Sequence, residues 1–190
     1  MSRLAMLTTD TMTDAQRTVH DAIMSGPRGR VHGRGTGLLG PFNAWIRSPS
    51  IADHAQQLGA FLRFGTQLPT RLSELAIIMV GRHMRAAFEF AAHAPLAIQG
   101  GLSEDVVDAI RKGETPSFAK KDERTVHSFA KELLEQHRVS NATYQSALEL
   151  LGEQAVVELV ALVGYYSLVS LTLNAFEVPL REGMQDPFAD

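Results

Sequence analysis

The chain has 190 residues, a hydrophobic content of 45% and a formal net charge of −3. This length and composition suffice for a real hydrophobic core, built as one domain or as two fused halves. The small negative charge, without a basic tail, gives no reason to expect nucleic acid as a partner. Because the sequence contains no cysteine, disulfides, thiolate metal sites and thiol catalysis are excluded. The first ten residues lack the pattern of a secretory signal, so a cytoplasmic location is expected.

Helical patterns dominate the chain, and no stretch shows the sustained alternation of a half-buried strand, so an all-α fold is predicted. Thr13 has a side chain that favours the N-cap position of a helix. Ser103, which two acidic residues follow, is also predicted to be an N-cap. The predicted helices span residues 14–25, 50–64, 71–92, a short stretch between Pro95 and Gly100, then 104–113, 122–137, 142–151 and 153–176. The glycine-rich segment 26–41 is predicted to be a loop.

Residues 155–176 carry one charge, that of Glu158, and are long enough to cross a bilayer. Tyrosine, serine, threonine and asparagine side chains interrupt the stretch, and no basic residue flanks it closely. We therefore interpret it as a buried central helix and expect no membrane insertion.

A shift of 84 residues reveals an internal repeat. Within positions 74–96, the residues identical to their counterparts after the shift are Glu74, Leu75, Ala91, Pro95 and Leu96. Each half then consists of a preceding helix, a long apolar helix with a Glu-Leu pair near its start, and a Pro-Leu pair that follows the long helix. The pattern predicts two related helical halves, residues 50–100 and 122–182.

Polar residues gather on one side of the predicted helix 71–92 and its continuation. At about 100° per residue, Arg82, Arg85 and His93 all fall within roughly 40° of Glu89, and Glu74 falls near the same stripe. Glu89 and His93 form an i, i+4 pair, and a carboxylate beside an imidazole suits proton transfer near neutral pH. Two nearby arginines could hold a substrate carboxylate.

The same spacing also occurs on solvated helix faces that carry only weak ion pairs. Here the residues between the charges are mainly alanine and phenylalanine, which favours a buried helix whose polar stripe faces a cavity or a subunit interface. His83 lies about 120° from Glu89 around the helix and would point away from the polar stripe. It would then either contribute to a site in a neighbouring subunit or be a surface histidine.

The runs LPTRLSELAII (68–78), Arg82-His83, FEFAAHAPLA (88–97) and GLS (101–103) resemble the signature of the carboxymuconolactone decarboxylase family. The run LVGYYSLVSLTLNAFEVPL (162–180) is similar to the C-terminal half of longer, cysteine-free members. The resemblance covers roughly residues 38–182 and implies one domain over residues 1–190 with the alkyl hydroperoxidase D-like helical fold. It also implies a homo-oligomer, either a trimer or a hexamer.

The peroxidases of this superfamily carry a glutamate, a Cys-x-x-Cys pair and a histidine. The resemblance places the glutamate at Glu74 and the histidine at His93, while Ala86 and Glu89 stand at the two cysteine positions. Thiol peroxidase activity is therefore not expected, because a dithiol relay needs both thiols. What remains is an acid–base frame in which Glu89 replaces the second thiol.

The family name implies decarboxylation of a small carboxylated lactone, which is a cofactor-free reaction. On this hypothesis His93 donates a proton with Glu89 as its orienting partner, Glu74 and His83 belong to the catalytic group, and Arg82 or Arg85 anchors the substrate carboxylate. The second half has Leu173 and Glu177 at the positions of Glu89 and His93, so one site per chain is expected.

Several alternatives remain open. The pattern GTGLLG at residues 35–40 matches a dinucleotide-binding motif but lacks the preceding strand, so it predicts a loop rather than a cofactor site. A metal site built from Glu89, His93 and His83 is disfavoured because His83 points elsewhere on one helix, and no metal or cofactor is expected. The protein is predicted to be an acid–base decarboxylase, lyase or isomerase of a small carboxylated intermediate of aromatic catabolism. The alternatives are a non-catalytic small-molecule binding protein and a purely structural oligomer.

Overall fold

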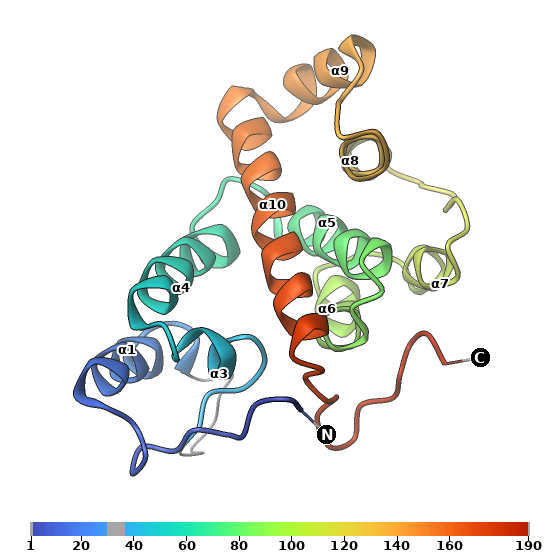
Figure 1. Ribbon diagram of the computed structural model, residues 1–190. Helices are drawn as coiled ribbons and strands as arrows, with labels where there is room; N and C mark the ends of the chain where they lie inside the picture. The colour runs from blue at the N-terminus through green and yellow to red at the C-terminus, as the bar shows by residue number, and fades with distance from the viewer. Residues whose placement is uncertain (1, 30–36, 190) are drawn as a thin grey trace. The chain divides into compact units, whose positions relative to one another are not determined.

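The computed structural model describes residues 2–29 and 37–189, and within these ranges it contains nine α-helices and no strand (Figure 1). The predicted all-α fold is confirmed. Residues 30–36 of the predicted loop 26–41 lie outside the described residues. The chain forms two compact units, residues 1–65 with 172–179, and residues 66–171 with 180–190. These units do not follow the predicted halves 50–100 and 122–182, and a single domain with an internal repeat stays a prediction.

The first unit contains α1 (Asp14–Ser25), α3 (Phe42–Trp45) and α4 (Pro49–Phe64). Thr13 caps α1 as predicted, because its hydroxyl accepts from the Gln16 N–H while the Gln16 side chain accepts from the Thr13 N–H. The short helix α3 was not predicted. Its Trp45 indole donates to the Thr172 hydroxyl at 2.9 Å, which ties α3 to the last turn of α10 within this unit.

The second unit contains α5 (Thr70–His83), α6 (Ala87–Gln99), α7 (Glu104–Lys112), α8 (Lys121–Gln136), α9 (Asn141–Leu151) and most of α10 (Glu153–Ala175). Ser103 caps α7 as predicted and accepts from the Val106 N–H at 3.3 Å. Every residue from position 72 to position 81 is buried, so α5 is the central helix of this unit.

Helix α10 is less buried than predicted. In the most apolar stretch of 18 residues, 61% is buried. By length and composition alone, the helix could cross a membrane. Val157, Val160, Leu168 and Leu171 are 65%, 44%, 45% and 57% exposed, at the spacing of one helix face. The sequence did not reveal this face, because the helix is apolar on nearly every side.

The predicted single helix 71–92 is wrong, since the chain turns back between His83 and Ala87. Arg85 adopts a left-handed conformation with φ of +49°. The Ala86 N–H donates to the Gly81 carbonyl at 2.8 Å, and the Arg85 N–H donates to the Arg82 carbonyl at 3.1 Å. This is a Schellman C-cap with arginine where glycine is usual. The shared polar stripe therefore does not exist, because its members lie on two helices and a turn.

The turn brings α5 and α6 very close together at Gly81. A Cβ placed there would lie 3.1 Å from the Phe90 backbone nitrogen, closer than packed side chains normally allow. Glycine at this position therefore permits the close approach of the two helices.

Two further differences concern the repeat. Pro95, expected to bound a separate short helix, lies inside α6, which continues to Gln99. Its counterpart Pro179 lies beyond the end of α10 at Ala175. Moreover, α10 runs unbroken through positions 168–170, which correspond to the turn 84–86. The two halves thus share sequence matches but not the same helix boundaries.

An ion-pair cluster joins the start of α5 to the start of α8. The Arg71 guanidinium lies 2.6 Å from an oxygen of Asp122 and 2.6 Å from an oxygen of Glu123. Glu123 is buried, so this cluster satisfies a carboxylate that would otherwise be costly to bury. It fixes the N-terminal end of α5, the helix that carries Glu74.

The left-handed turn predicts an unusual order of stabilities. At Arg85, a valine should lower the free energy of unfolding by about 1–2 kcal/mol relative to a glycine, because only glycine adopts positive φ without strain. At Glu149, an exposed position in α9, the order should reverse by a few tenths of a kcal/mol. Urea denaturation of the four variants checks this. The same order at both positions would contradict the assigned turn.

Candidate functional site

A buried histidine lies between two buried carboxylates in the second unit. His93 Nδ1 is 2.6 Å from Glu74 Oε2, and His93 Nε2 is 3.0 Å from Glu89 Oε1. Glu74 and Glu89 are each 3% exposed and His93 is 6% exposed. We call these three residues the triad. The geometry brings together three of the side chains that the sequence singled out.

The triad is assembled by the turn at Arg85 rather than by one helical stripe. Glu74 lies in the second turn of α5, whereas Glu89 and His93 lie on α6. The turn lays α6 back against α5, and this brings His93 to Glu74 across 19 positions of sequence. Glu89 reaches the other ring nitrogen from the same helix, as the i, i+4 spacing predicted.

The two carboxylates do not hold the ring equally. The Glu74 contact is a hydrogen bond of 2.6 Å. The Glu89 contact has ion-pair distance, but Glu89 Oε1 has no aligned hydrogen-bond donor among the described residues. The short distance and the missing hydrogen bond describe one poorly aligned contact between Nε2 and Oε1. Its main component is ionic attraction. Glu74 is therefore the residue that orients the imidazole, a role predicted from the sequence for Glu89.

The wall of the triad includes an aromatic side chain from α10. The Tyr166 ring meets the His93 ring edge to face, with centroids 5.2 Å apart. Tyr166 is buried, and Tyr165 packs against it with centroids 5.4 Å apart. Tyr166 is not among the site residues predicted from the sequence. It lies within the run 162–180 that resembles the family, but no spacing rule links it to His93.

The surroundings keep His93 protonated. Burial alone would lower the pKa of His93, because a charged ring is poorly solvated there. The negative charges of Glu89 and Glu74, together with the hydrogen bonds, outweigh burial and raise this pKa to about 9. At neutral pH the ring is thus an imidazolium. With both ring nitrogens carrying protons toward carboxylates, it has no lone pair to offer a metal ion.

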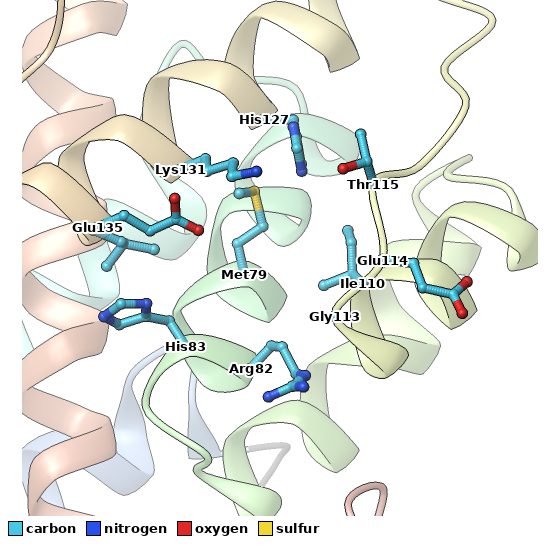
Figure 2. Close-up of a pocket in the computed structure, with 11 residues that line it drawn as sticks. Met79, Arg82, His83, Ile110, Gly113, Glu114, Thr115, His127, Lys131 and Glu135 are labelled. Carbon is cyan, nitrogen blue, oxygen red and sulfur yellow. The ribbon is translucent and has the colours of Figure 1, made fainter.

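The remaining predicted site residues lie away from the triad. Arg85 is exposed in the left-handed turn, and His83 is exposed at the end of α5. Arg82 and His83 line a cavity of about 290 Å³ between α5, α7 and α8 (Figure 2). The residues that line it are Met79, Arg82, His83, Ile110, Gly113, Glu114, Thr115, His127, Lys131, Leu134 and Glu135. None of these residues belongs to the triad. Arg82 therefore lines this cavity without Glu89 and His93, whereas the shared polar stripe predicted one cavity for all three.

A second cavity of about 540 Å³ lies between α6, α7 and the C-terminal segment. Phe90, Ile98, Val107 and Met184 give it apolar walls, and Arg111 stands among them. The triad residues do not line this cavity either.

Comparison with known proteins adds no family assignment. No protein-family model matches the chain, and no curated protein matches it. The relation to carboxymuconolactone decarboxylases rests on the residues quoted above and stays a prediction.

The raised pKa of His93 predicts a specific pH dependence of stability. Because the folded-state pKa lies above the ordinary value of 6.5, the stabilisation is fully present below about pH 6.5 and is lost as the pH rises through about 9. The loss should be on the order of 3 kcal/mol. Urea denaturation across this range should show it for the wild type and for Glu158→Gln, which alters a buried carboxylate outside the triad.

The reference is the double variant His93→Gln with Glu89→Gln, which has no imidazole and one carboxylate fewer. Its stability should fall less over the same pH range. Equal slopes for this variant and the wild type would show that His93 does not titrate in the assigned way.

Proposed function

We propose that the chain is a cofactor-free acid–base enzyme of the carboxymuconolactone decarboxylase type, with His93 as its proton donor. The observation that carries the proposal is the triad, a buried imidazolium between Glu74 and Glu89. A proton donor of this kind is what a decarboxylase needs once carbon dioxide has left. The substrate class, a small carboxylated lactone or related intermediate of aromatic catabolism, follows from the sequence resemblance.

The unequal contacts suggest which proton moves. Nδ1 is held by Glu74 in the shorter, aligned bond, whereas Nε2 faces Glu89 in a poorly aligned contact. Nε2–H is therefore the proton that is more easily given up. In the proposed step the carbon–carboxylate bond breaks and its electron pair enters the unsaturated lactone carbonyl. The resulting dienolate takes the Nε2 proton on carbon, and water later restores the imidazolium.

Three of the predicted site residues have no part in this step. Arg82, Arg85 and His83 lie outside the triad, so we assign none of them to proton transfer. Tyr166 joins the site as a positioning residue, because its ring packs against the imidazole in a T-shaped arrangement and limits the rotation of the imidazole.

A second candidate function is binding or assembly without catalysis. It is favoured by the near-complete burial of the triad and by its absence from the lining of the two cavities described above. On this alternative, Glu74, His93 and Glu89 form a buried ionic cluster that fixes α5 against α6. Turnover and its pH dependence separate the two candidates.

We also propose that the protein is a homo-oligomer, a trimer or a hexamer, located in the cytoplasm and bound neither to nucleic acid nor to a membrane. The exposed apolar face of α10, with Val157 at 65% and Leu171 at 57% exposure, supports assembly. A contiguous apolar face of this kind is typical of a subunit interface. The same face belongs to a helix that is long and apolar enough to cross a membrane. Assembly must therefore be tested directly.

Substitutions in the triad should lower turnover of a carboxylated lactone by about 10²- to 10⁴-fold, the usual contribution of a positioned proton donor. This applies to His93→Gln, Glu74→Gln and Glu89→Gln. Glu158→Gln serves as the matched control and should keep near wild-type turnover. Lactone absorbance and released carbon dioxide measure the reaction across a panel of substrates.

The pH–rate profile distinguishes chemistry from folding. Wild-type activity should fall as the pH rises through about 9, because His93 loses its proton there. In Glu89→Gln this fall should move to lower pH, since one negative charge that raises the pKa is gone. Full activity of His93→Gln on a substrate that the wild type converts would eliminate the proposed enzyme.

Assembly is tested by light scattering coupled to gel filtration. The wild type should elute as a trimer or hexamer at micromolar concentration, and Leu171→Glu should shift it toward the monomer by placing a charge in the interface. Gln145→Glu, at an exposed polar position of α9, is the control and should leave the oligomeric state unchanged. A wild-type monomer would contradict the proposed oligomer.

A further inference from the structure

The cavity between α5, α7 and α8 holds two basic side chains without acidic partners. Arg82 Nε is buried and has no hydrogen-bond acceptor among the described residues. The Arg82 guanidinium lies over the Phe188 ring, 5.5 Å from its centroid. That contact uses the flat face of the guanidinium, so it supplies no acceptor for the in-plane N–H groups.

Arg82 is also held in place by the end of α7. Gly113 adopts a left-handed conformation with φ of +79°, and a Cβ there would lie 2.7 Å from Arg82 Nη2. The missing side chain thus makes the room that the guanidinium occupies. A preorganised guanidinium with free in-plane donors is the standard protein partner of a carboxylate.

The other basic group comes from a different helix. Figure 2 shows Arg82 approaching from α5 and Lys131 from α8, with Met79 drawn between them. Lys131 lies at the exposed rim and forms no ion pair with any described residue. The lining also includes three buried apolar side chains, Met79, Ile110 and Leu134.

The lining also carries two carboxylates, and neither forms an ion pair with Arg82 or Lys131 in the described part of the chain. Glu114 is exposed and its carboxylate is directed away from the other labelled side chains (Figure 2). Glu135 is exposed on the Lys131 side of the cavity. His127 has its pKa lowered by burial and by Lys131, so it is a neutral ring there at pH 7. His83 is exposed at the edge.

We propose that this cavity binds a short aliphatic dicarboxylate, with one carboxylate on Arg82, the other on Lys131, and the carbon chain against Met79 and Ile110. Two cations on different walls, with apolar side chains among the lining, match two anionic ends joined by a short apolar spacer. The cavity of about 290 Å³ suits a metabolite of this size. The site shares no residue with the triad, and the proposal does not depend on the proposed catalytic function.

Isothermal titration calorimetry on the full chain tests it, at constant ionic strength and with succinate and glutarate as probes. Butyrate, with one carboxylate, and inorganic phosphate serve as competing ligand classes. The wild type should bind at least one dicarboxylate at millimolar concentration, about tenfold more tightly than butyrate, because butyrate lacks the second charge-assisted contact.

Arg82→Gln should weaken dicarboxylate binding by at least about tenfold, whereas Lys131→Met should weaken it by about tenfold, the contribution of the second contact, and leave butyrate unchanged. The matched controls are Arg138→Gln and Lys121→Met, two exposed basic residues outside the lining, which should stay within about twofold of wild type. Should Arg82→Gln fail to fold, Arg82→Lys keeps the charge but not the planar fork and should still bind less tightly.

Amide NMR on the wild type provides a second readout, with succinate-induced shifts expected around Ile110 and Thr115. Absence of dicarboxylate binding at millimolar concentration would overturn the proposal. So would equal affinity of Arg82→Gln and wild type, or shifts confined to other parts of the chain. Tighter binding of phosphate than of either dicarboxylate, lost in Arg82→Gln, would replace the proposed ligand by an inorganic anion.

Discussion

Two carboxylates, those of Glu74 and Glu89, are buried against a single imidazole ring. Burying an unpaired carboxylate costs several kcal/mol, so the pair is tolerated only while His93 carries a proton. The ring in turn is protonated at neutral pH because the negative charges of the two carboxylates raise its pKa to about 9. Loss of His93 would leave two buried carboxylates without a cation, whereas loss of either glutamate would leave one carboxylate paired with the imidazolium. The contact of α6 with α5 at this point and the chemistry proposed for the triad both involve this interaction.

The backbone turn at Arg85 is what makes the interaction possible. Had α5 continued through residue 92, Glu74 and His93 would lie nearly 30 Å apart along one axis, at about 1.5 Å per residue. Reversal of the chain brings them to 2.6 Å. Gly81 allows the close approach of α6, and the pairing of Arg71 with Asp122 and Glu123 fixes the other end of α5. The features that hold α5 therefore also hold the triad.

Local signals made most helix boundaries predictable, whereas the turn and the triad depend on contacts that spacing does not encode. Thr13 and Ser103 act through neighbours within four residues, so their roles follow from sequence. Arg85 takes a conformation that arginine seldom adopts, and no glycine or proline marks it. Glu89 and His93 were paired correctly because they share a helix. The Glu74 hydrogen bond, the contact with Tyr166 and the cavity that Arg82 lines arise from packing between helices, which helical periodicity cannot locate.

Direct observation of the imidazole protons tests this account most sharply. Long-range ¹H–¹⁵N correlation spectra of the histidine rings report whether each nitrogen carries a proton. Near pH 7.5, both nitrogens of His93 should be protonated in the wild type, and His93 should be identified by the loss of its signals in His93→Gln. An imidazolium at that pH, above the ordinary histidine pKa, would establish the carboxylate–imidazolium–carboxylate arrangement. A neutral His93 tautomer at the same pH would contradict it.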